Sequence, residues 1–145
     1  MNDLEMTWRN DGFAPSPPAG PFVPSFAQVY LKPDGDGVIC RVAVRAEHCN
    51  GFGTVHGGFL ATMADVFLGT NIARRLGPGV AFVTTNLAVD YLRTVSAGQW
   101  LESQIDRVKM GGRLCYISGV IVANGQEAVA IRATFAVLEP PPVKP

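Results

Sequence analysis

The sequence predicts an α+β fold in which one long helix packs against an antiparallel sheet. A run of twenty residues from Gly57 to Leu76 is apolar on almost every side and holds a single acidic residue, Asp65. A helix of this kind has to be covered by other structure. Two strand-like segments precede it and four follow it, with short turns between them. One apolar helix lying in a curled antiparallel sheet is a two-layer α+β arrangement.

The two ends of the 145-residue chain differ from its middle. Residues 1–25 carry five of the eleven prolines and little periodicity, which predicts an irregular or disordered N-terminal arm. The arm also carries three aromatic residues that would let it pack against the surface: Trp8, Phe13 and Phe22. The proline-rich residues 139–145 cannot continue a strand. We therefore expect one folded domain over residues 26–138.

Two segments before the helix predict a hairpin. Residues 26–31 and 38–45 have the composition of strands, and the PDGDG sequence between them predicts a turn. In the second segment valine and cysteine alternate with Arg41 and Arg45, so one face of this strand should be exposed. The helix over residues 57–76 should end at the Gly-Pro-Gly sequence that follows it.

Four segments after the helix predict the rest of the sheet. In the first of them, Val83 and Thr85 fall on one face together with Leu87, and Thr84 falls on the other. The turns between the four segments are short, and short connections join antiparallel neighbours. We therefore expect these segments to form one antiparallel meander, over residues 80–93, 99–109, 113–123 and 127–138.

The overall composition narrows the class of protein. Hydrophobic residues make up 48% of the chain and charged residues 17%, which fits a buried helix or an oligomer interface. The formal net charge is zero, so we expect neither nucleic acid nor an anionic membrane as the main partner. The three cysteines show no CxxC spacing, so neither a disulfide framework nor a zinc site is expected.

Segments that direct a chain into or across a membrane are not expected either. No apolar run reaches the length of about 18 residues that a transmembrane helix needs. The first residues do not show a charged start followed by an apolar core, which is the pattern of a signal peptide. Because unpaired cysteines suit a reducing compartment, we expect a cytoplasmic protein.

The residues from Asn50 to Asp65, NGFGTVHGGFLATMAD, carry the chemistry of this chain. A helix that opens on Gly57 and Gly58 presents free backbone N–H groups and the positive end of the helix dipole. The amide of Asn50 and the imidazole of His56 lie beside these groups, and the Asp65 carboxylate follows two turns later. Groups of these kinds can polarise a carbonyl and activate a water molecule.

Each of these residues also has a structural interpretation. Asn50 can hold its own loop by bonding the backbone as a turn, and Gly57 with Gly58 can serve a tight turn of positive φ. His56 can orient a neighbour or only cap the helix. Asp65 can be a buried acid that bonds a partner, since an isolated carboxylate on an apolar helix is costly. His48 has no partner at a meaningful spacing, so we expect it on a surface loop.

The combined motif resembles the hot-dog fold thioesterases, in particular the phenylacetate-pathway and human thioesterase-superfamily branch. The resemblance rests on HCNGFGTVHGG from His48, on Asp65, and on VTTNLAVDYLRTV from Val83. It covers residues 26–138 and departs at Thr94, where family members often have proline. It implies a hot-dog fold, in which a curled antiparallel sheet wraps around a long central helix.

The resemblance also implies roles for these residues. Asn50 and the Gly57 N–H would surround a thioester carbonyl, and His56 would orient these groups. Asp65 would act as general base or as nucleophile, two roles that the sequence does not separate. Thr84 matches a position that helps to hold the attacking water in some members. Its neighbour Thr85 would take that place if the alignment were shifted by one residue.

Substrate binding would involve further residues. Coenzyme A is expected as part of the substrate, and no separate cofactor and no metal is expected. The phosphates of CoA need cations, and four lie on or beside the last strands: Arg93, Arg107, Lys109 and Arg113. The substrate-binding candidates are therefore Gly58, Thr62, Arg93, Lys109 and Arg113. Family members are dimers or tetramers with sites divided between two chains, so a homodimer or homotetramer is implied here.

The sequence as a whole therefore predicts an acyl-CoA thioesterase that releases a free acid and CoA. Two alternatives stay open. One is a hot-dog protein that binds acyl-CoA without catalysis, and the other is a hot-dog hydratase or dehydratase. The acyl group itself is left undefined, with aryl, hydroxyaryl and aliphatic chains all compatible with the sequence.

Overall fold

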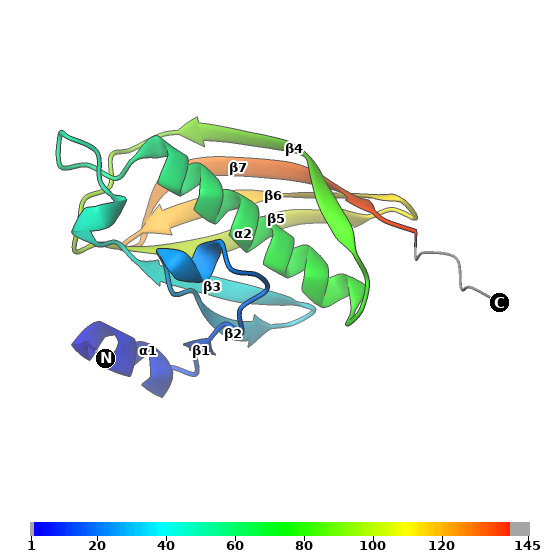
Figure 1. Ribbon diagram of the computed structural model, residues 1–145, viewed down its shortest axis with the longest axis horizontal. Helices are drawn as coiled ribbons and strands as arrows, with labels where there is room; N and C mark the ends of the chain where they lie inside the picture. The colour runs from blue at the N-terminus through cyan, green and yellow to red at the C-terminus, as the bar shows by residue number, and fades with distance from the viewer. Residues whose placement is uncertain (1, 140–145) are drawn as a thin grey trace.

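One antiparallel sheet of seven strands carries the long helix α2 on one face (Figure 1). The structure is a computed structural model that describes residues 2–139, so that the predicted tail lies outside the described residues except for Glu139. The elements in chain order are α1 (Asp3–Asn10), β1 (Ala14–Pro15), η1 (Val23–Ser25), β2 (Tyr30–Asp34), β3 (Gly37–Ala43), η2 (Ala46–His48), α2 (Gly57–Leu76), β4 (Phe82–Tyr91), β5 (Trp100–Met110), β6 (Leu114–Ala123) and β7 (Gln126–Val137).

The strand order in the sheet is β1-β2-β3-β5-β6-β7-β4. Strands β5, β6 and β7 form the predicted meander, but the predicted place of β4 is wrong. β4 pairs with β7 and lies at the edge of the sheet. It cannot pair with β5, because β5 has β6 on one side and Arg41–Ala43 of β3 on the other. The connection over residues 92–99 pairs with the segment that leads into α2, where the Val55 N–H donates to the Val95 carbonyl and Thr54 forms a bridge with Ser96. A connection of this length can reach either edge, so its length did not decide the pairing.

The hairpin before α2 is tighter than its sequence predicts. β2 covers Tyr30–Asp34 and takes in the first residues of the expected PDGDG turn. Asp34 pairs with Gly37, so only Gly35 and Asp36 remain as turn residues. Gly35 has a φ of 57°, the left-handed conformation that glycine adopts at little steric cost.

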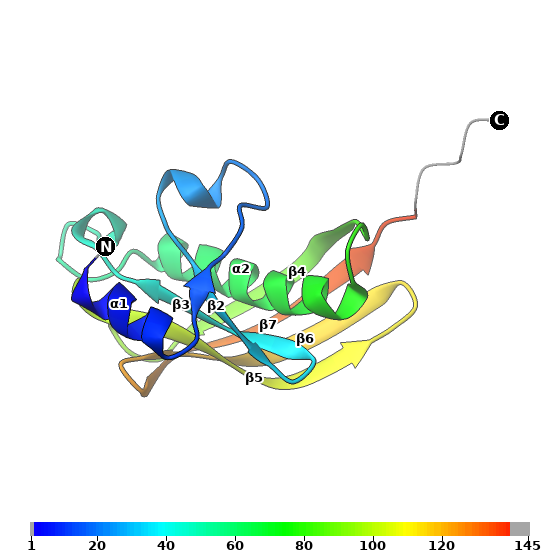
Figure 2. The same ribbon diagram turned by 90° about the horizontal axis from the view of Figure 1, so that it is seen from below.

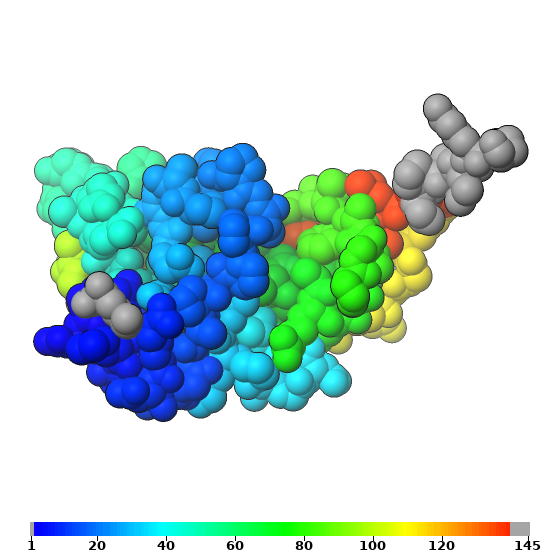
Figure 3. Space-filling model, turned by 60° about the horizontal axis from the view of Figure 1, so that its bottom comes forward, coloured from blue at the N-terminus to red at the C-terminus, as the bar shows by residue number. Residues whose placement is uncertain are grey.

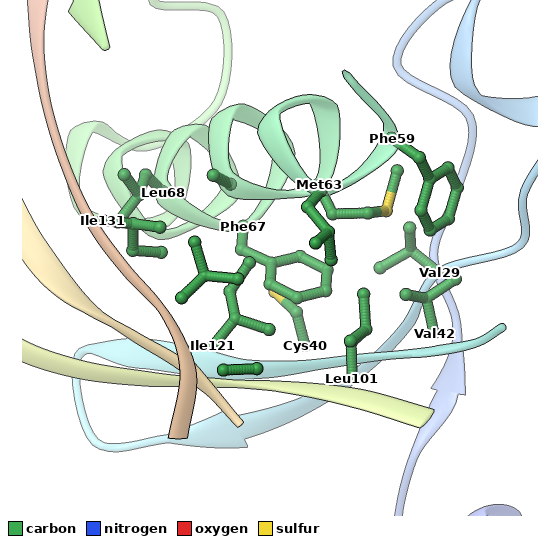
Figure 4. Close-up of a cluster of buried hydrophobic side chains, with 14 of the residues drawn as sticks. Val29, Cys40, Val42, Phe59, Met63, Phe67, Leu68, Leu101, Ile121 and Ile131 are labelled. Atoms are coloured by element: carbon green, nitrogen blue, oxygen red, sulfur yellow. The ribbon is translucent and has the colours of Figure 1, made fainter. Parts of the chain in front are cut away.

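The main core lies between α2 and the concave face of the sheet (Figure 4). Met63, Phe67 and Leu68 of α2 are fully buried there against side chains of the sheet such as Ile121. Burying a side chain of this size contributes about 1.5–3 kcal/mol. Cys40 lies in the same core, and burial raises the pKa of its thiol to about 12, against the opposing effect of a hydrogen bond with Ser103.

The N-terminal segment contains a helix, which corrects the expectation of an irregular arm at residues 3–10. α1 starts with a capping box between Asn2 and Glu5, a pattern that satisfies two free N–H groups at a helix start. It packs on the sheet face opposite α2, where Trp8 is fully buried. Phe13 also packs there, and the Arg41 guanidinium lies 4.1 Å from the centre of its ring. Phe22 remains 67% exposed.

A second part of the N-terminal segment, which we call the proline-rich loop (residues 16–29), crosses α2 on the side away from the sheet (Figure 2). Its base is closed by a hydrogen bond from the Ser16 N–H to the Val29 carbonyl at 2.8 Å. Its end is held where the Arg45 guanidinium donates to the Phe26 carbonyl at 2.8 Å. α2 is therefore covered by the sheet on one side and by this loop on the other.

One buried polar side chain of α2 fixes the helix to β3. Asn71 is 1% exposed. It accepts a hydrogen bond from the Val38 N–H (3.1 Å) and donates one to the Val38 carbonyl (3.0 Å). Asn71 thereby satisfies the N–H and the carbonyl of Val38, which lies outside the part of β3 that pairs with β5.

Replacing Asn71 by alanine should therefore lower the free energy of unfolding by about 2–6 kcal/mol, because two buried backbone groups lose their partner at about 1–3 kcal/mol each. Urea denaturation measures this change. Thr70→Ala is the matched control, since the Thr70 hydroxyl bonds only the Val66 carbonyl of its own helix. Equal stability of Asn71→Ala and Thr70→Ala would contradict this role.

Candidate active site

The start of α2 is organised around His56. This residue is the N-cap of the helix, and its Nδ1 accepts a hydrogen bond from the Gly58 N–H at 2.8 Å. Because a backbone N–H can only donate, the neutral ring must carry its proton on Nε2. His56 is exposed, so this Nε2–H group is a hydrogen-bond donor at the surface. The arrangement suits an orienting or polarising role better than that of a base.

The two glycines leave room for neighbouring side chains. A Cβ atom at Gly57 would lie 3.3 Å from the ring and hydroxyl of Tyr91, and one at Gly58 would lie 2.9 Å from His56 Nδ1. Neither glycine has a positive φ, which corrects the expectation of a tight turn of that kind. Within residues 2–139, no acceptor receives the Gly57 N–H. This group is therefore free to bind a ligand at the positive end of α2.

Tyr91 is a residue of this site that the sequence analysis did not select. Its hydroxyl donates a hydrogen bond to the Gly57 carbonyl at 2.7 Å and so ties the end of β4 to the start of α2. The alternation along β4 placed Tyr91 on the same face as Leu87. That signal identified the face and could not identify the contact.

Asn50 holds its own loop, which is the structural interpretation that the sequence left open. Its Oδ1 accepts from the N–H groups of Phe52 (2.9 Å) and Thr54 (3.3 Å). Its Nδ2 donates to the Thr54 hydroxyl at 3.0 Å. An amide nitrogen carries two protons, so Asn50 keeps one donor for a ligand while it shapes the turn.

His48 is buried, which corrects its expected place on a surface loop. It is 4% exposed, and its ring stacks on Phe59 with the ring centres 4.0 Å apart. Its Nδ1 accepts from the Arg45 N–H, and its Nε2 lies 2.7 Å from the Phe26 carbonyl. Both ring nitrogens are used in holding the loop before α2, so His48 is structural.

Asp65 and Thr84 form the second group of the site. The Thr84 hydroxyl donates to Asp65 Oδ1 at 2.7 Å, across the space between α2 and the edge strand β4. Asp65 is half-buried, and Thr84 is exposed. The other carboxylate oxygen has no hydrogen-bond partner among the described residues, and it can accept a proton from a bound molecule.

A β-bulge brings Thr84 to Asp65. Thr84 pairs with Phe135 and Asn86 with Thr134, so that Thr85 is the extra residue of β4. The bulge reverses the alternation, which places Thr84 on the same face as Leu87 and leaves Val83 46% exposed. Thr85 bonds Thr134 instead. The face expected for these threonines from strict alternation was therefore wrong.

The two groups lie apart within one chain. Gly57 and Asp65 lie eight residue steps apart along α2, which is about 12 Å at about 1.5 Å per residue. A single carbonyl group cannot contact Asp65 and the start of the same helix. Thr62, between them, donates its hydroxyl to the Gly58 carbonyl of its own helix.

The candidate cations for CoA are also separated. The Arg93 N–H bonds the Ala128 carbonyl, and the Arg113 carbonyl accepts from the Val137 N–H. These contacts lie nine residue steps apart along β7, which is about 30 Å at about 3.3 Å per residue. Arg113 forms an exposed ion pair with Glu139 (2.6 Å), and Lys109 lies on the same exposed hairpin. One phosphate group cannot reach both ends of a single chain.

Comparison with known proteins decides the family. Residues 52–130, which include the start of α2, Asp65 and Thr84, match the model of the thioesterase superfamily. The chain belongs to this superfamily. The hot-dog fold and the family resemblance predicted from the sequence are thereby confirmed.

Relatives of this thioesterase-superfamily protein include a candidate esterase of Pseudomonas aeruginosa, which is 31% identical over 121 residues, or 83% of this chain and 90% of that protein. Human acyl-coenzyme A thioesterase 13 is 28% identical over 99 residues, or 61% of this chain and 69% of that protein. A hypothetical thioesterase of Streptococcus pneumoniae, solved with coenzyme A, superposes with a TM-score of 0.67 at 24% identity and covers 74% of this chain and 84% of its own.

Among residues 2–139, no three His, Cys, Asp or Glu side chains gather as metal ligands would. No helix in the same part of the chain combines the length and the apolar character that a membrane crossing requires.

Replacing Gly58 by alanine should displace the His56 ring, because the new Cβ would lie 2.9 Å from Nδ1. We expect the ¹⁵N chemical shifts of His56 to report an unprotonated Nδ1 acceptor in the wild type and to change in Gly58→Ala. Loss of a helix cap should also lower stability by about 1 kcal/mol. Gly51→Ala is the control, since no atom lies within 4 Å of a Cβ there. Unchanged His56 signals in Gly58→Ala would contradict this arrangement.

Proposed function

We propose that this protein hydrolyses acyl-CoA thioesters to a free acid and CoA. The observation that carries the proposal is the Asp65–Thr84 hydrogen bond, which presents a half-buried carboxylate next to the open edge of the sheet. Whereas the Asp65 carboxylate accepts hydrogen bonds, the Gly57 N–H and the His56 Nε2–H donate them at the start of α2. The relative named acyl-coenzyme A thioesterase 13 and the neighbour solved with coenzyme A support the substrate class.

A complete site needs two chains. β4 is an edge strand, and within the described residues nothing pairs with its outer side. Edge strands of this length readily pair with another chain, and a two-fold interface uses the same surface of both subunits. A two-fold axis through the middle of β4 would place Tyr91 of one chain opposite Phe82 of the other. Thr84 would then lie opposite Val89 of the second chain, close to the Tyr91 that holds Gly57.

This arrangement brings the separated groups together. Asp65 and Thr84 of one chain would face the start of α2 of the second chain, with its Asn50, His56 and Gly57. We therefore propose a homodimer as the smallest active unit, and a tetramer would contain two such dimers. The exposed apolar side chains of Val83 and Tyr91 on β4 support an interface here.

In the proposed reaction, water attacks the thioester carbonyl carbon. Thr84 holds Asp65 Oδ1, so that Oδ2 accepts the proton of the water while the new C–O bond forms. The negative charge moves to the carbonyl oxygen, where the Gly57 N–H, Asn50 Nδ2 and His56 Nε2–H stabilise it. The C–S bond then breaks, the CoA sulfur takes up the proton that Asp65 accepted from the water, and the acid is released with Asp65 again ionised. Direct attack by Asp65 on the carbonyl is the alternative use of the same carboxylate.

The cations serve the other end of the substrate. We propose that Arg93 of one chain and the exposed Lys109 and Arg113 of the other hold the CoA phosphates, because the two-fold arrangement places these groups at the same end of the dimer. We also propose that Gly58 and Thr62 contact the substrate between these cations and the carbonyl. This chemistry requires no cofactor besides the CoA that the substrate itself carries.

The hydratase alternative loses support from the two histidines. Such a reaction would need, beside the acid, a histidine with an unprotonated ring nitrogen that is free to take a proton from the substrate. Both ring nitrogens of His48 form hydrogen bonds with the backbone of Arg45 and Phe26. His56 Nδ1 accepts a hydrogen bond from the Gly58 N–H. A binding protein without catalysis remains the competing interpretation, and the release of free thiol from acyl-CoA separates it from an enzyme.

The test compares three variants in a thiol-release assay. Asp65→Asn should lower kcat by at least about 100-fold, since an amide cannot accept the proton and general base catalysis contributes about 10²–10⁴. Thr84→Val should lower kcat about tenfold, the effect of a lost hydrogen bond of about 1.4 kcal/mol. Thr85→Val is the matched control and should keep kcat within about twofold, as its hydroxyl bonds only Thr134 within the described residues.

The comparison of the two threonines separates the mechanism from general damage to β4. Equal losses in Thr84→Val and Thr85→Val would contradict the specific role of Thr84. Wild-type turnover by Asp65→Asn would remove Asp65 from the reaction, and no thiol release from any acyl-CoA by the wild type would refute the proposed function.

A further inference from the structure

A pocket lies directly beside Asp65 and Thr84, between α2, the start of β4 and the proline-rich loop. Its volume is about 660 Å³, which falls in the range of about 300–1,000 Å³ that small-molecule sites occupy. Along α2 it extends from Asp65 to Ala73, a distance of about 12 Å at about 1.5 Å per residue. Figure 3 shows the loop standing against the second half of α2 and the start of β4.

The walls of this pocket are apolar on all three sides. The loop contributes Pro17–Pro24, α2 contributes Val66 and Gly69, and the sheet contributes Phe82 and Phe135. Gly69 widens the pocket on the helix side, because a helix residue with a larger side chain would project toward the two phenylalanines. An apolar cavity with polar groups at one end is the usual form of a site for an amphiphilic ligand.

The polar side chains of the lining are used within the chain, apart from those of the Asp65–Thr84 pair. The hydroxyls of Ser16 and Thr70 donate to backbone carbonyls, and so does the amide nitrogen of Gln28. A ligand hydroxyl or carboxylate placed deep in this pocket would therefore exchange its water for at most one donor of these groups, the second N–H of Gln28. Burial of a polar group under such conditions is unfavourable.

We infer that the pocket beneath the proline-rich loop binds the acyl group of the substrate and selects an apolar acyl group, aryl or medium-chain alkyl, that carries no hydroxyl or carboxylate. The inference rests on the proposed function, since it assumes that the thioester carbonyl lies at Asp65. The carbonyl at Asp65 directs the acyl group along α2 toward Ala73, and the CoA toward the second chain. The loop residues Phe22 and Val23 then act as specificity-determining residues.

Binding can be measured apart from catalysis with thioether analogues of acyl-CoA, which cannot be hydrolysed. By calorimetry, affinity should rise about fourfold per methylene from the acetyl to the octanoyl analogue, the increment for burial of one CH₂ group. The 4-hydroxyphenylacetyl analogue should bind about 10–100-fold more weakly than the phenylacetyl analogue. CoA alone should bind more weakly than the octanoyl and phenylacetyl analogues.

Two variants test the two walls. Phe22→Ala/Val23→Ala should weaken binding of the octanoyl analogue about tenfold and leave that of the acetyl analogue and CoA unchanged. Met6→Ala is the matched control, because Met6 is an exposed apolar residue of the same N-terminal segment outside the pocket. Gly69→Val narrows the pocket from the helix side and should shift the preference toward shorter acyl groups, so the inference remains testable if the loop variant does not fold.

The outcomes distinguish the inference from the proposed function. If the analogues bind as expected but no acyl-CoA is hydrolysed, the pocket assignment stands and the proposed function fails. If acyl-CoAs are hydrolysed but the loop and Gly69 variants keep the wild-type profile of chain length, the pocket assignment is wrong. Tighter binding of the hydroxylated analogue than of the phenylacetyl analogue would overturn the selection for apolar acyl groups.

Discussion

Helix α2 is apolar on nearly every side, and the need to cover it determines the rest of this structure. The sheet covers one side through Met63, Phe67 and Leu68. The proline-rich loop covers part of the opposite side. Along β4 the cover remains incomplete, because β4 is an edge strand. The half-buried Asp65 carboxylate lies at this margin, where a ligand can reach a side chain of the otherwise covered helix.

Strand β4 positions the polar groups of the candidate site beside the apolar helix. The bulge at Thr85 turns Thr84 toward Asp65, and Tyr91 at the other end of β4 holds the start of α2. One strand thus positions both groups, and about 12 Å of helix separates them within a chain. In the proposed dimer, a second copy of β4 in antiparallel pairing would supply the missing half at each end. The edge strand and the proposed division of the site would then both follow from one arrangement.

The parts of the fold that follow from local pattern could be predicted from the sequence, and those that depend on distant contacts could not. The apolar run and its Gly-Pro-Gly stop predict α2, and alternation with short turns predicts β5, β6 and β7. The edge position of β4 depends on β3 taking the place beside β5, which no local signal reports. α1 was missed because the prolines after it dominate the composition, although its capping box from Asn2 to Glu5 can be read from the sequence.

The candidate site divides in the same way. The residue types around His56 and Asp65 point to carbonyl chemistry because glycines at a helix start and a lone acid on an apolar helix both need an explanation. The bulge that selects Thr84 over Thr85 leaves no mark in the sequence, since threonine suits either position. The burial of His48 depends on Arg45 and on Phe26, which lies 22 residues before it, so spacing along the chain could not reveal it.

In the proposed dimer each site takes Asp65 from one chain and the start of α2 from the other, and mixing two inactive variants distinguishes this arrangement from a site within one chain. Asp65→Asn lacks the base. Asn50→Asp keeps the Oδ1 acceptor that shapes the loop and loses the Nδ2 donor. After dissociation and random reassociation of equal amounts, about a quarter of wild-type activity should return, because half of the dimers are mixed and one of their two sites is intact. Activity no higher than that of the separate variants would show that both residues act within one chain, which would contradict the divided site.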